Sequence, residues 1–184
     1  MQRGLAKLLA TRRDAVVEAW WEKVLELYDE RARNLLRRNE DPFTNPLRST
    51  FVSAMERIVD CMAAGQDIDT ARDAIREVVK LRAIQDVSPG EALDSFLVFR
   101  KALKEVAKDS WDEVADEAVG AQDALVRLAA DEYLGAQKLI LDIKYRERVR
   151  RFHLIVRRAS LTAPQSLWTE EQLNVNPNGA EDLL

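Results

Sequence analysis

Two pairs of carboxylates in this chain have a spacing that would suit metal binding or acid–base chemistry. Asp112 and Asp116 lie four residues apart, as do Glu113 and Glu117, so on a helix each pair would project from one face. Di-iron helical bundles use such carboxylates, but they also need Glu-x-x-His pairs on two helices. The chain contains a single histidine. We therefore interpret the carboxylates as a solvated helix face, and the sequence predicts neither a metal site nor a cofactor.

The single histidine and the single cysteine do not complete another reactive group. His153 has no second histidine with which to bind zinc. A catalytic serine would need a motif such as Gly-x-Ser-x-Gly, and a phosphate site would need a glycine-rich loop; the sequence has neither. Cys61 falls among apolar helix positions, which predicts a buried and unreactive thiol. We therefore expect a protein that is not an enzyme.

The composition is that of a soluble globular protein. The chain has 184 residues, enough for one domain with a real core, and 47% of them are hydrophobic and 33% charged. The net charge of −4 argues against general nucleic-acid binding. No apolar run approaches the ~18 residues of a transmembrane helix. We expect a cytoplasmic protein with no transmembrane segment and no nucleic-acid partner.

The elements that must position these residues are all predicted to be helices. Between Leu5 and Leu27 the apolar residues recur at spacings of three and four, so residues 3–38 are predicted as one or two helices with a break near Thr11–Asp14. No segment shows the alternation typical of a strand. Further helices are predicted over residues 46–64, 70–86, 88–107 and 110–159. The fold class is therefore all-α, a bundle of about 5–7 helices with a long C-terminal helix.

Capping residues mark two helix starts clearly. Asn45 is predicted to cap a helix that has Pro46 at its first position. The Ser88 hydroxyl can accept from the Glu91 amide while the Glu91 carboxylate accepts from the Ser88 amide, and Pro89 suits the first helical position. We assign these five residues a structural role.

Two other helix starts carry weaker signals. Asp69 is a candidate cap for the helix over residues 70–86, and Ser110 with Glu113 repeats the capping-box pattern before the long last helix. The inward face of the helix over residues 70–86 is predicted to consist of Ala71, Ile75, Val78, Val79 and Ala83.

The last 25 or so residues differ in character from the rest of the chain. Their charged residues are all acids, namely Glu170, Glu171, Glu181 and Asp182. Thr169 and Gln172 form a capping-box pattern for one short helix. We therefore predict a helical domain over residues 1–159 and a C-terminal tail with a short helix over residues 160–184.

The long last helix carries a strong charge gradient. Residues 109–132 hold eight acids and one base, whereas residues 144–158 hold seven bases and one acid. Acids near the start and bases near the end complement the helix macrodipole, at roughly 0.3–1 kcal/mol for each well-placed charge. This explains the direction of the gradient but not its size, because the influence of the dipole fades beyond the terminal turns.

An apolar row lies within the basic part of that helix. Tyr145, Val149, Phe152 and Val156 are spaced by four, three and four residues, with Arg148 beside them. An apolar row on a basic helix is typical of a surface that binds a partner or a membrane. We expect these five residues to contact a protein partner, which includes a second copy of the chain. Packing within the chain, and contact with anionic lipid or nucleic acid, are the alternatives.

Aromatic and polar residues elsewhere supply a candidate ligand or signal site. Trp20, Trp21 and Tyr28 occupy helical positions and either belong to the core or line a small-molecule pocket between helices. Arg82 and Gln85 are polar residues beside the apolar face of their helix. We take these five residues as the candidate site.

Several of these segments together resemble a known family. They are Trp20–Trp21, residues 41–47 (DPFTNPL), residues 81–89 (LRAIQDVSP) and residues 91–93 (EAL). These segments are similar to the RsbRD-type N-terminal domain, the sensor module of stressosome co-antagonist proteins. The likeness covers about residues 5–155.

The resemblance implies a globin-like, all-helical fold that binds no haem and associates as a homodimer. It also implies that signals pass through the helix that leaves the C-terminus of the module. In stressosome proteins the module precedes a STAS domain, whereas here we expect it to stand alone. The sequence independently disfavours haem, because a globin binds its iron through a histidine on a mid-chain helix and residues 70–107 contain none.

Together these observations predict a non-enzymatic sensory or regulatory binding module. We expect it to act through protein–protein contacts of its long C-terminal helix. The alternative is a small accessory or assembly subunit of a larger redox or membrane-associated complex.

Overall fold

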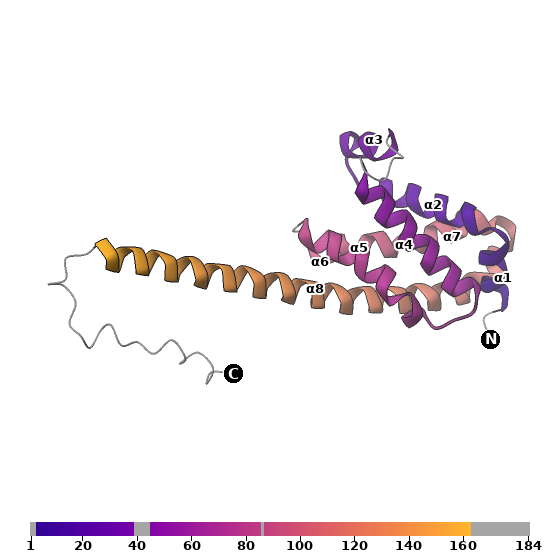
Figure 1. Ribbon diagram of the computed structural model, residues 1–184. Coiled ribbons are helices and arrows are strands. Elements are labelled where there is room, and N and C mark those ends of the chain that lie inside the picture. The colour runs from indigo at the N-terminus through magenta and orange to yellow at the C-terminus, as the bar shows by residue number, and fades with distance from the viewer. Residues whose placement is uncertain (1–2, 39–44, 86, 163–184) are drawn as a thin grey trace. The chain divides into compact units, whose positions relative to one another are not determined.

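The computed structural model describes residues 3–38, 45–85 and 87–162 (Figure 1). Within these ranges all regular structure is helical and no strand occurs. The helices are α1 (Arg3–Thr11), α2 (Arg13–Leu25), α3 (Glu30–Arg38), α4 (Pro46–Ala63), α5 (Arg72–Ile84), α6 (Pro89–Leu97), α7 (Phe99–Ala107) and α8 (Trp111–Thr162), with short 3₁₀ helices η1 (Ile68–Ala71) and η2 (Lys108–Ser110). The predicted all-α class with a long C-terminal helix is confirmed. The predicted short helix of the tail, and most of the motif at residues 41–47, lie outside the described residues.

The chain forms two units, Met1–Leu141 and Asp142–Leu184, and α8 contributes residues to both. The first unit is the helical bundle. The described part of the second unit is helix. The predicted boundary between residues 159 and 160 stays a prediction.

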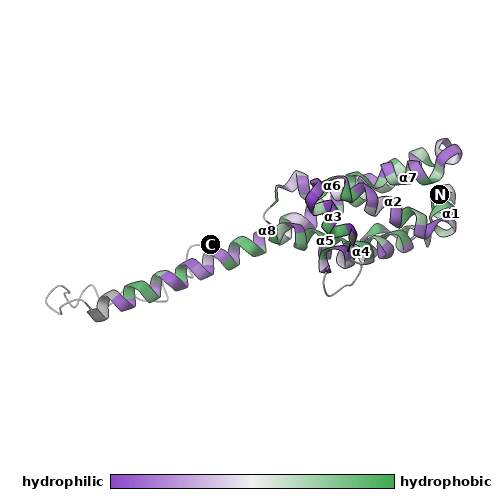
Figure 2. Ribbon diagram, turned by 90° about the horizontal axis from the view of Figure 1, so that it is seen from above, coloured by the Kyte–Doolittle hydropathy of each residue, from purple (hydrophilic) through white to green (hydrophobic). Residues whose placement is uncertain are grey.

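The first unit has one continuous hydrophobic core. Trp20 lies 4.5 Å from Phe99 and Trp21 lies 6.1 Å from Phe51, measured between ring centroids. The predicted inward face of α5 is entirely buried. In Figure 2, hydrophobic and hydrophilic residues alternate along the helices of the bundle, which is the pattern of helices with one face on a core.

Residues 3–38 form three α-helices where one or two were predicted. The first break, at Arg12, falls in the predicted region. The second follows α2, where Arg33 donates to the carbonyl oxygens of Leu25 at 3.0 Å and Tyr28 at 2.9 Å. The Leu25 carbonyl oxygen also accepts from the Tyr28 amide at 3.1 Å, so the guanidinium adds a second donor there and stabilises the end of α2. Asp29 then accepts from the Ala32 amide at 2.8 Å and starts α3.

The two clear caps form hydrogen bonds at α4 and α6. The Asn45 side chain accepts from the Arg48 amide at 3.1 Å, and Pro46 is the first residue of α4. At α6 the Glu91 amide donates to the Ser88 hydroxyl, and the Ser88 amide donates to the Glu91 carboxylate at 2.8 Å.

Asp69 does not cap the helix that follows it, so that prediction was wrong. Asp67 accepts from the Asp69 amide and begins the 3₁₀ turn η1, and α5 starts only after Ala71. The Asp69 carboxylate instead forms an ion pair with Arg72. The 3₁₀ turn η1 was not predicted, and because of it α5 begins at Arg72, two residues after the predicted start at residue 70.

Candidate functional site

Arg82, near the end of α5, joins three elements of the first unit. Its Nη1 donates to the Tyr28 hydroxyl at 3.1 Å and to Gln85 Oε1 at 2.9 Å. Its Nη2 donates to the Glu91 carbonyl oxygen at 3.2 Å, in the first turn of α6. The guanidinium carbon also lies 5.5 Å from the centroid of the Tyr28 ring, within the range of a cation–π contact. Three of the five candidate residues, Arg82, Gln85 and Tyr28, therefore meet.

The charges around Arg82 shift two neighbouring groups. Burial raises the pKa of Tyr28, and the positive charge of Arg82 opposes that rise. Hydrogen bonds from Ser88 lower the pKa of Glu91, and the Arg82 charge lowers it further. At neutral pH Tyr28 thus stays a neutral phenol whose oxygen accepts from Arg82, and Glu91 stays a carboxylate that accepts from Ser88.

Trp20 and Trp21 do not join the Arg82 group. Trp20 is 1% exposed, and its indole N–H donates to the Ser95 carbonyl oxygen at 2.7 Å. The cavity beside Trp20 has a volume of about 10 Å³, which is room for about one water molecule. Trp21 is also buried. The packing therefore favours the core alternative for both tryptophans.

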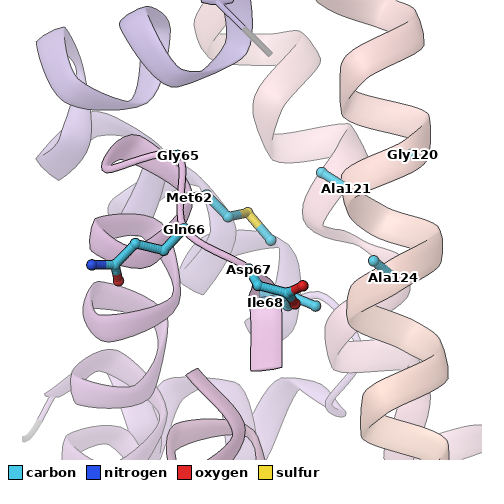
Figure 3. A pocket seen from close by; sticks show the side chains of 8 residues that line it. All are labelled: Met62, Gly65, Gln66, Asp67, Ile68, Gly120, Ala121 and Ala124. Atoms are coloured by element: carbon cyan, nitrogen blue, oxygen red, sulfur yellow. The ribbon is translucent and has the colours of Figure 1, made fainter. Parts of the chain in front are cut away.

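A hollow that sequence reasoning missed lies between α8 and the turn after α4 (Figure 3). Its volume is about 390 Å³. Its lining residues are Met62, Gly65, Gln66, Asp67, Ile68, Gly120, Ala121 and Ala124. In Figure 3 Gln66 points away from α8, and the Asp67 carboxylate already accepts from the Asp69 amide at 3.0 Å. The hollow arises because the residues of α8 at this point, Gly120, Ala121 and Ala124, have almost no side chain. These small residues were the feature of the sequence from which the hollow could have been predicted.

The two carboxylate pairs at residues 112–117 have two different roles. Asp112, Glu113 and Asp116 are exposed, as the prediction of a solvated face requires. Glu117 is half-buried instead and accepts from the Leu5 amide at 2.8 Å. That amide is one of those that α1 leaves without an intrahelical acceptor. The prediction of a solvated face was therefore wrong for Glu117, which caps α1.

Glu132 is the second acid of α8 that has a partner within the first unit. Its side chain is 11% exposed and accepts from Arg72 Nη1 and from Arg76 Nε, each at 2.7 Å. The Arg76 and Arg72 hydrogen bonds lower the pKa of Glu132, while burial works in the opposite direction. Nearby, the Tyr133 hydroxyl donates to the Val87 carbonyl oxygen at 2.6 Å. These bonds hold α8 against α5 and the segment that follows it.

In the second unit, the predicted partner-binding residues all lie on the α8 helix and are exposed. Tyr145 is 67% and Phe152 64% exposed, and Val149 and Val156 are exposed to a lesser degree. Arg148 is exposed as well. Leu154 and Ile155, which the predicted row did not include, are also exposed and line an open hollow of about 420 Å³ with Arg157 and Arg158.

No group of three or more His, Cys, Asp or Glu side chains within the described ranges is placed to hold a metal ion. Over the same ranges, no helix combines the length and the apolar character that a membrane crossing needs.

Comparisons with known proteins match the chain to a family of domains. No curated protein and no solved structure matches the chain. Residues 14–148, well over half of the chain, match the RsbT co-antagonist protein rsbRD N-terminal domain. This match confirms the resemblance noted in the sequence, and the chain belongs to that family.

Proposed function

We propose that this chain is a regulatory sensor module of stressosome-type signalling that acts through protein–protein contacts of residues 142–158. The family suggests the regulatory sensor role. The contact surface is our own inference from the second unit, whose helix carries apolar side chains among arginines. We call residues 142–158 the basic segment.

The observation that carries the proposal is the exposure of the apolar row on the basic segment. Large apolar side chains on a soluble protein are normally buried, and a continuous exposed group of them marks an interaction site. In the row Tyr145 and Phe152 are each more than three-fifths exposed, and Ile155 beside the row is exposed to the same degree. A partner that covers them gains the free energy of apolar burial, about 25 cal/mol for each Å² removed from water.

The module would be a non-enzymatic, cytoplasmic homodimer without a cofactor. In support of a non-enzymatic role, several polar side chains of the first unit hold its helices together. Glu117, Glu132, Arg82 and Tyr133 each bond to another element of that unit.

The Arg82 group is our candidate for the place where a signal enters. It ties α5 to the turn after α2 and to the start of α6. A ligand or partner that competes for the bonds of Arg82 would favour one arrangement of these elements over another. In that case Trp20 and Trp21 would not contact the ligand, and any change in their packing would come through the core that they share with these elements.

The alternative function, an accessory subunit of a larger complex, uses the same basic segment in another way. In that case the segment binds a different protein, and the purified chain is a monomer at all concentrations. In the regulatory proposal the chain associates with itself.

The test is the solution mass of the full chain with and without its apolar row. We expect a mass of two copies for the natural chain and of one copy for the double variant Val149→Ser/Phe152→Ser, because the variant removes the apolar contact. Leu35→Ser is the matched control, since Leu35 is 70% exposed on α3, outside the basic segment, and its loss should leave the mass unchanged. A double variant that keeps the mass of two copies would contradict the proposal.

A further inference from the structure

The α8 helix presents a second exposed surface, in the first unit. It consists of acids and apolar residues at helical spacing, namely Asp112, Asp116, Val119, Asp123, Asp131 and Leu134. We call these residues the acidic face. All six are exposed, Val119 by 38% and Leu134 by 64%.

The acids of this face differ from the two inward acids of α8, which have partners within the first unit. Glu117 caps α1 and Glu132 binds two arginines, so the inward acids are satisfied within the unit. Asp116 and Asp123 form no ion pair among the residues that the structure describes. Arg127 is the one base exposed among them. The face therefore keeps a net negative charge.

The basic segment has the opposite excess. Its two acids are already paired within the helix, Asp142 with Arg146 at 2.8 Å and Glu147 with Arg151 at 3.3 Å. Within the described ranges Arg148 and Arg150 form no ion pair. This positive excess surrounds the apolar row of the proposed function.

Two basic segments are poor partners for each other. When helices pair through a row spaced by four and three residues, the side chains that flank the row face those of the other helix. Arg146 and Arg148 flank the row that contains Tyr145 and Val149. Pairing a basic segment with itself would therefore bring arginines against arginines, and like charges across an interface oppose association.

The geometry points to a contact between unlike surfaces: we propose that the basic segment of one copy binds the acidic face of α8 on a second copy. This inference rests on the proposed function and specifies what the segment recognises. The arginines would meet Asp116 and Asp123, and the apolar row would meet Val119 and Leu134. A closed dimer uses this contact twice, once in each direction.

The shape of the acidic face also suits an aromatic side chain from outside. A Cβ atom added at Gly120 would meet no atom within 4 Å, so the glycine there does not serve packing within the unit. The 390 Å³ hollow of Figure 3 opens beside it, against Ala121 and Ala124. Phe152 or Tyr145 of the second copy would find room there that the chain itself leaves unfilled.

Charge reversal with complementation tests this contact on the full chain. We expect Asp116→Arg/Asp123→Arg and Arg148→Glu/Arg150→Glu each to raise the dissociation constant of the dimer by roughly tenfold or more, because each places like charges opposite one another. An equimolar mixture of the two variants should regain the mass of two copies. In the mixed dimer the two reversed surfaces complement each other in one contact, and the two natural surfaces meet in the other. Glu18→Arg is the control, because Glu18 is an exposed acid on α2 with no ion pair among the described residues.

The outcomes separate this inference from the proposed function. If Asp116→Arg/Asp123→Arg keeps the full affinity of the natural chain while Val149→Ser/Phe152→Ser loses the dimer, the acidic face is not the partner surface, and the proposed function stands. If the natural chain has the mass of one copy at every concentration, this inference and the proposed homodimer are both wrong. Weakening by both reversals with recovery in the mixture supports the inference.

Discussion

At the scale of single residues, the carboxylates of α8 show how burial decides the role of a side chain. Glu117 and Glu132 belong to the same acidic stretch as Asp112 and Asp116, yet only the former bind other elements. A half-buried carboxylate needs hydrogen bonds to offset the loss of water, whereas an exposed one does not. The sequence shows the acids but not which of them turn inward.

The pKa of Glu132 predicts how stability depends on pH. Its pKa is lowered below the ordinary value of 4.5 in the folded chain, chiefly by the Arg76 hydrogen bond. The stability from this group is therefore fully present above the unfolded value and is lost as the pH falls through the lower folded value. We expect Glu132→Gln to lower the free energy of unfolding at pH 7, and to lower it less at acid pH, where the natural carboxyl is protonated.

Urea denaturation of the full chain and of Glu132→Gln between pH 3 and about 7 measures this difference. Glu113→Gln is the control, because Glu113 is an exposed acid of α8 outside the acidic face. An equal loss of stability at every pH would show that the ion pairs to Arg72 and Arg76 do not set the effect.

At the scale of elements, helix ends that depend on neighbouring residues could be predicted, and those that depend on distant ones could not. The Ser88–Glu91 capping box lies within four residues, and its hydrogen bonds are present. The cap of α1 comes from Glu117, 112 residues away from Leu5, and no local pattern points to it. The same reason explains why the hollow beside Gly120 was missed, because it forms between α8 and the distant turn after α4.

The cap of α1 by Glu117 gives an element-scale prediction. Glu117→Ala should lower the free energy of unfolding by about 1 kcal/mol, the usual cost of losing a side-chain cap at a helix N-terminus. Its matched control is Glu113→Ala, one turn earlier on α8 and exposed, which should change stability by less than about 0.5 kcal/mol. Equal effects in urea denaturation would contradict the assignment of Glu117 as the cap.

The candidate site could be predicted only in part, again for reasons of distance. Arg82 and Gln85 are three residues apart on a helix, and their contact follows from that spacing. Tyr28 reaches Arg82 across 54 residues of sequence, and Trp20, which the sequence grouped with Tyr28, bonds instead to Ser95. Side-chain type alone could not separate these two aromatics.

At the scale of the whole molecule, the uneven distribution of charge along the chain matters more for association than the net charge does. The chain carries −4 overall, yet residues 144–158 hold seven of its 28 bases. Charged surfaces of opposite sign on one chain favour association of copies at low salt, and salt screens that attraction beyond about 10 Å at 0.1 M. The family supplies the regulatory role, and the basic segment supplies the surface through which we propose that it acts.

The most direct test of the account is hydrogen–deuterium exchange of the full chain at protein concentrations well below and well above that at which two copies associate. We predict that amides of residues 142–158 exchange more slowly at high concentration, because a partner covers the segment, while those of α4 are unchanged. Exchange of residues 142–158 that stays the same when the solution mass has doubled would contradict it.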